Sequence, residues 1–314
     1  MTGVIVTGGL GFIGSHTVRR LAESSLVDKI FIIDNLYSGS IRNIDDLPRE
    51  KIVFRNIDVC SYRGLLDAFR GFRGMDDILA VIHLAAVISL MEAEENPRNA
   101  LRVNHGGTIN ILETMRRLDI DKIIYASSVA VYGEPMYLPI DEGHPLRPIN
   151  IYGLSKKLSE DSIISYSRSH GLRAIILRYF NVYGPGMRPG EYAGVIYRFI
   201  EARIRGRRGV IHGDGEQTRD FIYVTDVADA NIKALNVDYT GAINIGSGEM
   251  VTINKLYRMI FGDVEPIYSD PRPRDIRRSM ASIDRAMKIL GWRPRIGLRD
   301  GLKYTKEYYR NIVK

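Results

Sequence analysis

A glycine-rich turn near the start of the chain constrains its fold more than any other feature of the sequence. The segment Thr7–Gly14 follows an apolar run that predicts a strand at Val4–Val6, and it leads into an amphipathic stretch that predicts a helix at Phe12–Ala22. Glycines at such a junction allow a tight turn and leave the first N–H groups of the helix open to an anion. The first predicted unit is therefore a strand–turn–helix suited to a phosphate group.

Apolar runs continue to alternate with amphipathic stretches as far as Arg178. The predicted strands are Ile30–Ile33, Ile52–Phe54, Leu79–His83, Lys122–Ala126 and Arg173–Arg178. The predicted helices are Tyr62–Phe69, Pro97–Leu118 and Tyr152–His170. Such alternation predicts right-handed crossovers and a parallel sheet covered on both faces, and the continuously apolar strands agree with it. The expected fold class is α/β, a Rossmann-like doubly wound parallel sheet.

The character of the chain changes after Arg178. A Gly- and Pro-rich stretch, Asn181–Tyr192, predicts a loop. Shorter elements follow, with helices near Val195–Arg205, after Val224, from Ile253 and from Leu298, and strands at Val210–His212 and Ala242–Ile245. We expect residues 1–178 to form the cofactor-binding domain, with 219–240 returning to it. Residues 179–314 would mainly form a smaller C-terminal substrate-binding lobe.

The charge balance and the cysteine content limit the possible partners and compartment. The 314 residues carry 44 Lys and Arg against 37 Asp and Glu, and the formal charge of +7 favours acidic partners. No basic stripe interleaved with aromatic residues is present, so we expect no nucleic-acid partner. The longest apolar run, Ile78–Leu90, is too short to span a bilayer, and we expect no metal site. The single cysteine, Cys60, excludes an intrachain disulfide and favours the reducing cytoplasm.

Two carboxylates accompany the glycines and predict a dinucleotide site. Gly8 allows the tight turn, Gly11 lets the backbone approach a pyrophosphate, and Gly14 lets the helix pack closely on the strand. Asp34 ends the second predicted strand 20 residues after Gly14. Its carboxylate would bind a ribose diol and repel a 2′-phosphate, which favours NAD over NADP. Asp58, after the third strand, either meets the adenine or caps the next helix.

Tyr152 and Lys156 form a candidate acid–base pair, because residues four apart share one face of a helix. A free phenol, with a pKa of about 10, is a poor base at neutral pH, but a neighbouring ammonium stabilises the phenolate. Ser128 ends a strand at the carboxyl edge of the sheet, where its hydroxyl would hydrogen-bond Tyr152 and the reacting oxygen. His83 also ends a strand, and we interpret it as a structural histidine because Tyr152 already fills the role of base.

With these motifs the chain resembles the extended short-chain dehydrogenase/reductases, and within them the UDP-galactose/UDP-glucose 4-epimerases. The resemblance runs through nearly the whole chain in order. The matching motifs are Thr7–Gly14, Asp34-Asn35, Asp58, His83–Ala86, Asn104 in Val103–Thr108, Ser127–Gly133, Tyr152 with Lys156, Arg178–Pro185, and Gly213–Gly215 with Arg219–Val224.

The resemblance implies a role for each matching residue. Catalysis would fall to Ser128, Tyr152 and Lys156. The implied NAD contacts are Gly8, Gly11, Phe12, Ile13, Gly14, Asp34, Asn35, Asp58, Val59, Leu84, Ala85, Ala86, Asn104, Tyr152, Lys156 and Tyr179. The implied contacts to a UDP-sugar substrate are Ser128, Tyr152, Asn181, Arg219, Arg272 and Asp275. Arginines suit the diphosphate because their forked donors match its oxygens.

The residues after Ser128 favour one reaction within this family. Family 4,6-dehydratases carry an Asp-Glu pair there, whereas this chain has Val129 and Ala130, which cannot transfer protons. The expected activity is therefore a UDP-hexose 4-epimerase with tightly bound NAD and a transient 4-keto sugar. Ser279 lies where the family limits sugar bulk, and its small side chain suggests that N-acetyl sugars are also accepted.

Several alternatives stay open at this point. One is a sister enzyme, either a UDP-glucuronate epimerase or decarboxylase or a dTDP-glucose 4,6-dehydratase. Another is a non-enzymatic scaffold that binds NAD or nucleic acid. The resemblance also implies a homodimer, joined as a four-helix bundle through Pro97–Leu118 and Tyr152–His170 of each copy.

Overall fold

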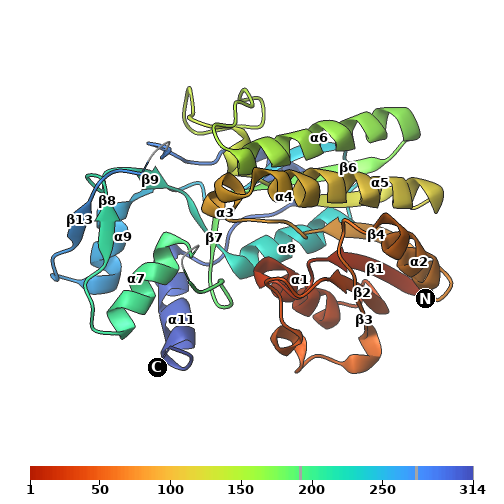
Figure 1. Cartoon of the computed structure of the whole chain (residues 1–314), viewed down its shortest axis with the longest axis horizontal. Coiled ribbons are helices and arrows are strands. Elements are labelled where there is room, and N and C mark those ends of the chain that lie inside the picture. Colours follow the sequence, from red (N-terminus) through yellow and green to blue (C-terminus); the bar gives the residue numbers. More distant parts are fainter. Residues whose placement is uncertain (191–192, 273–274, 314) are drawn as a thin grey trace.

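A seven-stranded parallel sheet forms the centre of the computed structural model, which describes residues 1–190, 193–272 and 275–313. The strand order is β11-β6-β5-β4-β1-β2-β3. The bounds are β1 Thr2–Thr7, β2 Lys29–Asp34, β3 Ile52–Asn56, β4 Asp77–His83, β5 Lys122–Ser128, β6 Arg173–Tyr179 and β11 Gly241–Ile245. Helices cover both faces of this sheet, so the predicted α/β, Rossmann-like doubly wound architecture is confirmed (Figure 1).

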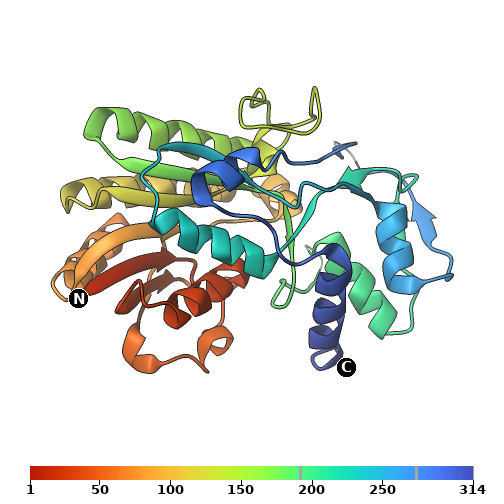
Figure 2. The same ribbon diagram turned by 180° about the vertical axis from the view of Figure 1, so that it is seen from behind.

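Alternating side chains along the strands divide the core into two apolar layers. In β1, Val4 and Val6 face one layer, and Ile5 between them faces the other. The first layer is covered by α1 (Phe12–Glu23), α8 (Val224–Leu235) and α10 (Asp284–Leu290). The second is covered by α2 (Tyr62–Arg73), α5 (Gly107–Arg117) and α6 (Ile151–His170). Figure 2 shows α8 and α1 side by side on the first face. The inner strands are therefore apolar on both sides, as their sequences indicate.

The helix predicted over Pro97–Leu118 consists of three consecutive segments. They are α4 (Pro97–Leu101), a π-helical turn (Arg102–Gly106) and α5. The widened turn holds the buried side chain of Asn104, whose amide oxygen accepts a hydrogen bond from the Val87 N–H. Its amide nitrogen donates to the Val87 carbonyl and to the Ser155 hydroxyl. A tertiary contact thus interrupts a pattern that is helical in sequence.

A smaller lobe lies beyond the carboxyl edge of the sheet (Figure 1). Its elements are α7 (Val195–Ile204), β8 (Val210–His212), β9 (Thr218–Arg219), β12 (Val251–Thr252), α9 (Ile253–Phe261), β13 (Ile267–Ser269) and α11 (Leu298–Arg310). Its apolar core is separate from those of the sheet and includes Phe199 packed edge-on against Tyr257. The loop predicted over Asn181–Tyr192, described as far as residue 190, contains a short strand, β7 (Asn181–Tyr183), which pairs with β10 (Phe221–Tyr223).

The chain returns from the lobe to the sheet well beyond residue 240. After α8, strand β11 pairs with β6 as the outermost strand. Helix α10 then packs against β11, and the buried Trp292 donates a hydrogen bond from its indole nitrogen to the Asp226 carbonyl of α8. The sheet is therefore completed by residues late in the sequence. Within the described ranges, no helix has the length and apolar character needed to cross a membrane.

Candidate active site

A cavity of about 300 Å³ opens at the carboxyl edge of the sheet, where the strand order reverses between β1 and β4. Ligands bind at such a reversal in open α/β sheets. Of the predicted cofactor contacts, those lining it are Gly8, Gly11, Phe12, Ile13, Gly14, Asp34, Asn35, Asp58, Val59, Leu84, Ala85, Ala86, Tyr152, Lys156 and Tyr179. Asn104 does not line it, because its amide holds the loop at Val87.

The glycines of the first turn are required by close packing. Gly8 has a φ of +68°, and a Cβ there would lie 2.7 Å from the Ala85 nitrogen. A Cβ on Gly14 would lie 2.0 Å from the Gly8 carbonyl oxygen. Gly11, in contrast, faces open space apart from that carbonyl, and α1 begins there without a side-chain cap. The first N–H groups of α1 therefore face a surface that a phosphate can approach closely.

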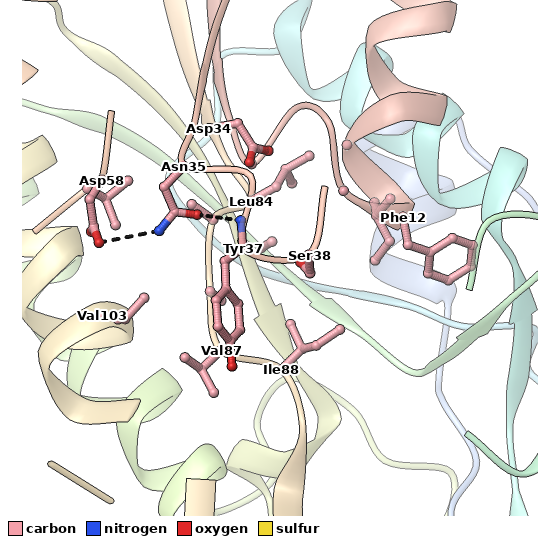
Figure 3. A pocket seen from close by; sticks show the side chains of 18 of the residues that line it. Phe12, Asp34, Asn35, Tyr37, Ser38, Asp58, Leu84, Val87, Ile88 and Val103 are labelled. Atoms are coloured by element: carbon pink, nitrogen blue, oxygen red, sulfur yellow. Dashed lines mark hydrogen bonds between the residues drawn. The ribbon is translucent and has the colours of Figure 1, made fainter. Parts of the chain in front are cut away.

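Three polar side chains line the cavity wall at the ends of β2 and β3. The buried Asp34 carboxylate accepts hydrogen bonds from the N–H groups of Leu10 and Leu36, and burial raises its pKa, partly offset by these bonds. Asn35 donates to the Asp58 carboxylate over 3.3 Å (Figure 3). Burial raises the pKa of Asp58, but hydrogen bonds from Cys60 and Asn35 outweigh it and leave the pKa below its usual value. Asp58 thus shapes the turn before α2.

The catalytic candidates lie where α6 crosses the end of β5. Tyr152 and Lys156 occupy successive turns of α6 and both line the cavity. The Lys156 ammonium donates to the Ala126 carbonyl over 2.8 Å and lies 6.0 Å from the centre of the Tyr152 ring. The Ser128 side chain lies close enough to Tyr152 to affect the pKa of its phenol, and its hydroxyl accepts a hydrogen bond from the Ala130 N–H. The structure therefore brings the three residues together.

Burial dominates the electrostatics of this pair. It raises the pKa of the Tyr152 phenol, and the hydrogen bond with Ser128 opposes the rise. It lowers the pKa of the Lys156 ammonium to about 7, and the Glu160 carboxylate opposes that fall. Burial thus favours the neutral form of both groups. Because the pKa of Lys156 lies near neutrality, its side chain gains or loses a proton at neutral pH at little cost in free energy.

His83 is structural, as its sequence context predicts. Its ring is buried, with Nδ1 2.6 Å from the Thr7 hydroxyl and Nε2 3.1 Å from the Thr108 hydroxyl. Burial, with a smaller effect from Lys156, lowers its pKa to about 3. An imidazole that is neutral at neutral pH and has both nitrogens hydrogen-bonded cannot serve as the acid.

The predicted substrate residues lie in the lobe and at its junction with the sheet. The Arg219 guanidinium donates to the carbonyls of Thr218 and Ile276 and pairs with the Asp275 carboxylate. Asp275 and Arg272 line a second cavity together with His212. The Asn181 amide donates to the Asp220 carbonyl, and this bond fixes the amide at the start of β7, next to β10. Arg274, in the same basic cluster, lies outside the described residues.

Some polar residues at these cavities escape motif reasoning. Tyr37 lines the first cavity, and its hydroxyl bonds to Glu92 of α3 (Leu90–Glu95). Glu92 also pairs with Arg188, whose guanidinium lies 5.3 Å from the Tyr37 ring centre. Arg198 of α7 lies near Arg272, and burial, followed by that neighbouring charge, lowers its pKa to about 10. Each belongs to a different loop or helix, so no spacing in the sequence joins them.

Comparison with known proteins assigns the chain to a family. The NAD dependent epimerase/dehydratase family matches residues 4–246, and the chain belongs to it. The protein is therefore an NAD-dependent enzyme of the extended short-chain dehydrogenase/reductase type.

Individual relatives are similar along their full length. A Methanocaldococcus jannaschii protein provisionally named UDP-glucose 4-epimerase is 44% identical, with 98% of each chain covered. The UDP-glucose 4-epimerase of Thermotoga maritima, solved with UDP-glucose, has a TM-score of 0.92 at 34% identity and covers 99% of this chain and 100% of its own. The UDP-N-acetylglucosamine 4-epimerase of Methanobrevibacter ruminantium has a TM-score of 0.91 at 35% identity, covering 99% and 98%. An Arabidopsis thaliana UDP-glucuronic acid decarboxylase is 30% identical, covering 98% and 88%.

The cavity suits NAD on its own structural terms. Gly11 leaves room at the uncapped start of α1 for a pyrophosphate, and Asp34 offers carboxylate oxygens at the end of β2. The far wall carries Tyr152 and Lys156. These residues would hold the two ends of the dinucleotide, with the nicotinamide half toward α6.

Proposed function

We propose that the protein interconverts UDP-glucose and UDP-galactose at C4. The observation that carries this proposal is the turn directly after Ser128. Residues Val129–Val131 form a short 3₁₀ turn with only aliphatic side chains, so no second acid–base pair stands beside the catalytic candidates there. A 4-keto sugar held by Tyr152 and Ser128 would then have one simple fate, which is reduction on its other face. The relatives from Methanocaldococcus and Thermotoga support the same substrate class.

The proposed reaction returns every proton and electron pair to the sugar. When bound, NAD supplies the acceptor, and later the donor, of the C4 hydride. The Tyr152 phenolate removes the proton of the C4 hydroxyl while Ser128 donates a hydrogen bond to the same oxygen. Lys156 stabilises the phenolate by its charge. After the sugar turns, Tyr152 returns the proton to the new hydroxyl, so the cycle leaves the protein unchanged.

Product analysis by proton NMR with a panel of UDP-sugars tests this function. We expect UDP-galactose to give UDP-glucose, with no net change in the redox state of the bound cofactor. Conversion of UDP-glucuronate to a UDP-pentose, with no change in UDP-galactose, would instead assign the decarboxylase reaction. Retention of NAD without turnover of any sugar would support a scaffold protein.

The same site is proposed to accept N-acetyl sugars. Ser279 is small and buried, its N–H donates to the Thr218 hydroxyl, and its own hydroxyl has no partner among the described residues. The Methanobrevibacter neighbour, named for UDP-N-acetylglucosamine, supports this extension. Inclusion of UDP-N-acetylglucosamine in the panel checks it, and a complete lack of turnover at saturating concentration would contradict it.

A homodimer is proposed through α4, α5 and α6. Together these helices form one outer layer of the molecule (Figure 1), and Leu154 of α6 keeps 37% of its surface exposed. Pairing with a second copy would bury that surface in a four-helix bundle.

A further inference from the structure

Helix α6 is anchored to the end of β5 by three residues at successive turns. Tyr152 lies next to Ser128, which opposes the rise in the pKa of its phenol, and Lys156 donates to the Ala126 carbonyl. One turn further on, the Glu160 carboxylate accepts a hydrogen bond from the Ser127 hydroxyl. Residues at this spacing share one helix face. The last three residues of β5 are thus each held by one residue of the helix, and the third contact has no part in the reaction described above.

Glu160 is itself held by a buried arginine of the neighbouring strand. The Arg178 guanidinium of β6 donates to both Glu160 oxygens, at 3.1 and 3.2 Å from Nε and 2.6 Å from Nη2. The side chains are 3% and 6% exposed. Arg178 also donates to the Tyr132 hydroxyl, which in turn donates to Asn244 of β11. A bidentate pair of this kind fixes the carboxylate in one geometry.

We propose that Glu160, held by Arg178, is a positioning residue for the reaction: it fixes the end of β5 through Ser127 and places a negative charge one helical turn from Lys156. The expected effect on the reaction rate rests on the proposed function. The contacts of Glu160 do not, because they are present without substrate. The charge part of the proposal follows from distance. Lys156 lies one helical turn from Glu160, about 6 Å along the axis, whereas Tyr152 lies two turns away.

Glu160 is the only negatively charged group identified near Lys156 in the described chain. From β4, His83 faces the lysine and is neutral, since its pKa lies at about 3. From β5, the Tyr125 ring centre lies 4.9 Å from the ammonium, and Ala126 presents its carbonyl. From α6, the Tyr152 ring centre lies 6.0 Å from the ammonium. Burial lowers the pKa of Lys156 to about 7, and Glu160 opposes that fall.

Loss of the Glu160 charge should therefore weaken the base. In Glu160→Gln, the Lys156 pKa falls further, so the ammonium loses its proton at a lower pH and the Tyr152 phenolate loses support. We expect kcat at about pH 8 to fall roughly tenfold, with KM nearly unchanged and the alkaline limb of the pH profile shifted toward acid. The single variant leaves the buried Arg178 guanidinium without its counter-charge, so a second variant is needed beside it. The double variant Glu160→Gln/Arg178→Gln removes both charges together and should show the same kinetic change.

Three comparisons keep the test specific. Arg178→Lys retains the counter-charge and should keep most of the activity. Asp161→Asn, which removes the exposed partner of Lys157 on the same helix, should leave both the rate and the pH profile unchanged. Ser127→Ala removes only the hydrogen bond to β5 and should lower kcat severalfold without moving the alkaline limb, which separates position from charge.

A readout without substrate distinguishes this proposal from the proposed function. Side-chain NMR of the lysines during a pH titration, with the Lys156 signal assigned by its absence from the Lys156→Met variant, reports the ionisation of Lys156 alone. We expect this ionisation to move to lower pH in the double variant. A shift without turnover of any UDP-sugar would defeat the proposed function and leave this inference standing. An unchanged Lys156 titration and pH profile in the folded double variant would overturn the inference.

Discussion

At the scale of single residues, the site is governed by burial more than by pairwise charge. Tyr152 and Lys156 lie in the same cavity wall, and burial moves their pKa values apart. The phenol becomes a weaker acid and the ammonium a stronger one. This differs from the simple expectation that the lysine charge alone makes the phenol acidic.

The first prediction concerns the phenolic oxygen of Tyr152. Tyr152→Phe removes the proton acceptor but keeps the ring, so the fold and NAD binding should persist. We expect kcat to fall by at least about 100-fold, which is the usual contribution of a positioned general base. Steady-state kinetics with UDP-galactose and calorimetric titration with NAD measure the two effects. Near-normal turnover in this variant would remove Tyr152 from the mechanism.

The second prediction concerns His83 and stability at low pH. Its folded pKa is lowered to about 3, below the unfolded value of 6.5, so the unfolded chain binds a proton that the folded chain excludes. Stability is therefore lost as the pH falls below 6.5, by about 1.4 kcal/mol per unit from this residue. Between pH 7 and 5 the protein should lose about 2 kcal/mol more than His83→Asn. Denaturant unfolding at both pH values gives the difference, and equal losses would contradict the assignment.

At the scale of elements, apolar periodicity in the sequence predicts those helices and strands that pack directly on the sheet. The strands from β1 to β6 and helices α1, α2 and α6 agree with the apolar periodicity, because each buries its own apolar face on the sheet. The π-helical turn at Arg102–Gly106 did not follow from periodicity, because the Asn104 contacts that accompany it reach residues distant in sequence. The short helices α3 and α10 were also missed, since each spans two turns or fewer.

The candidate site divides in the same way. The glycines and carboxylates next to strand ends can be identified from the sequence, because their spacing along one strand–turn–helix unit defines the cavity. Tyr37, which lines the first cavity, and Arg188 and Arg198, which lie near lining residues, were missed because they belong to separate segments. The sequence indicates that Arg219 and Asp275 belong to the substrate region, but it does not reveal that they pair with each other.

The third prediction tests the close contact between α1 and the first turn. A Cβ on Gly14 would lie 2.0 Å from the Gly8 carbonyl, so Gly14→Ala must move α1 away from β1. We expect a loss of NAD affinity of at least tenfold and a lower melting temperature. The matched control is Gly71→Ala in α2, where a Cβ meets nothing within 4 Å. That change should leave NAD binding intact and raise helix stability by roughly 0.5–1 kcal/mol. Equal effects of the two substitutions would contradict the packing argument.

At the scale of the whole molecule, the sheet and the lobe share one chain that crosses between them repeatedly. Strand β11 and helix α10 belong to the sheet, although β11 follows the first three lobe elements in sequence and α10 follows all of them except α11. Trp292, the only tryptophan, is buried where this returning segment meets α8. Its fluorescence therefore reports the docking of that segment and not the lobe itself.

The fourth prediction concerns the proposed dimer. Leu154 and Leu158 lie on α6 with exposed and half-buried side chains, and the double variant Leu154→Glu/Leu158→Glu would place two charges in the bundle. We expect light scattering after size exclusion to give a dimer for the unaltered chain and a monomer for the variant. Exposed positions outside these helices provide the control, for example Ile312→Glu, which should stay dimeric. A monomeric unaltered chain at micromolar concentration would refute the proposal.

The late return of β11 has a consequence for the order in which the protein is made. The strands that flank the cofactor cavity, β1, β2, β4 and β5, are complete once residue 128 has left the ribosome. Strand β6 follows, but its outer edge finds a partner only at residues 241–245, and the helix that packs on that partner only at 284–290. An unpaired apolar strand edge readily joins another chain. A nascent chain halted before residue 241 would thus contain most of the nucleotide pocket, but the outer edge of β6 would be unpaired and prone to aggregation. Early binding of the cofactor in that pocket would not cover this edge.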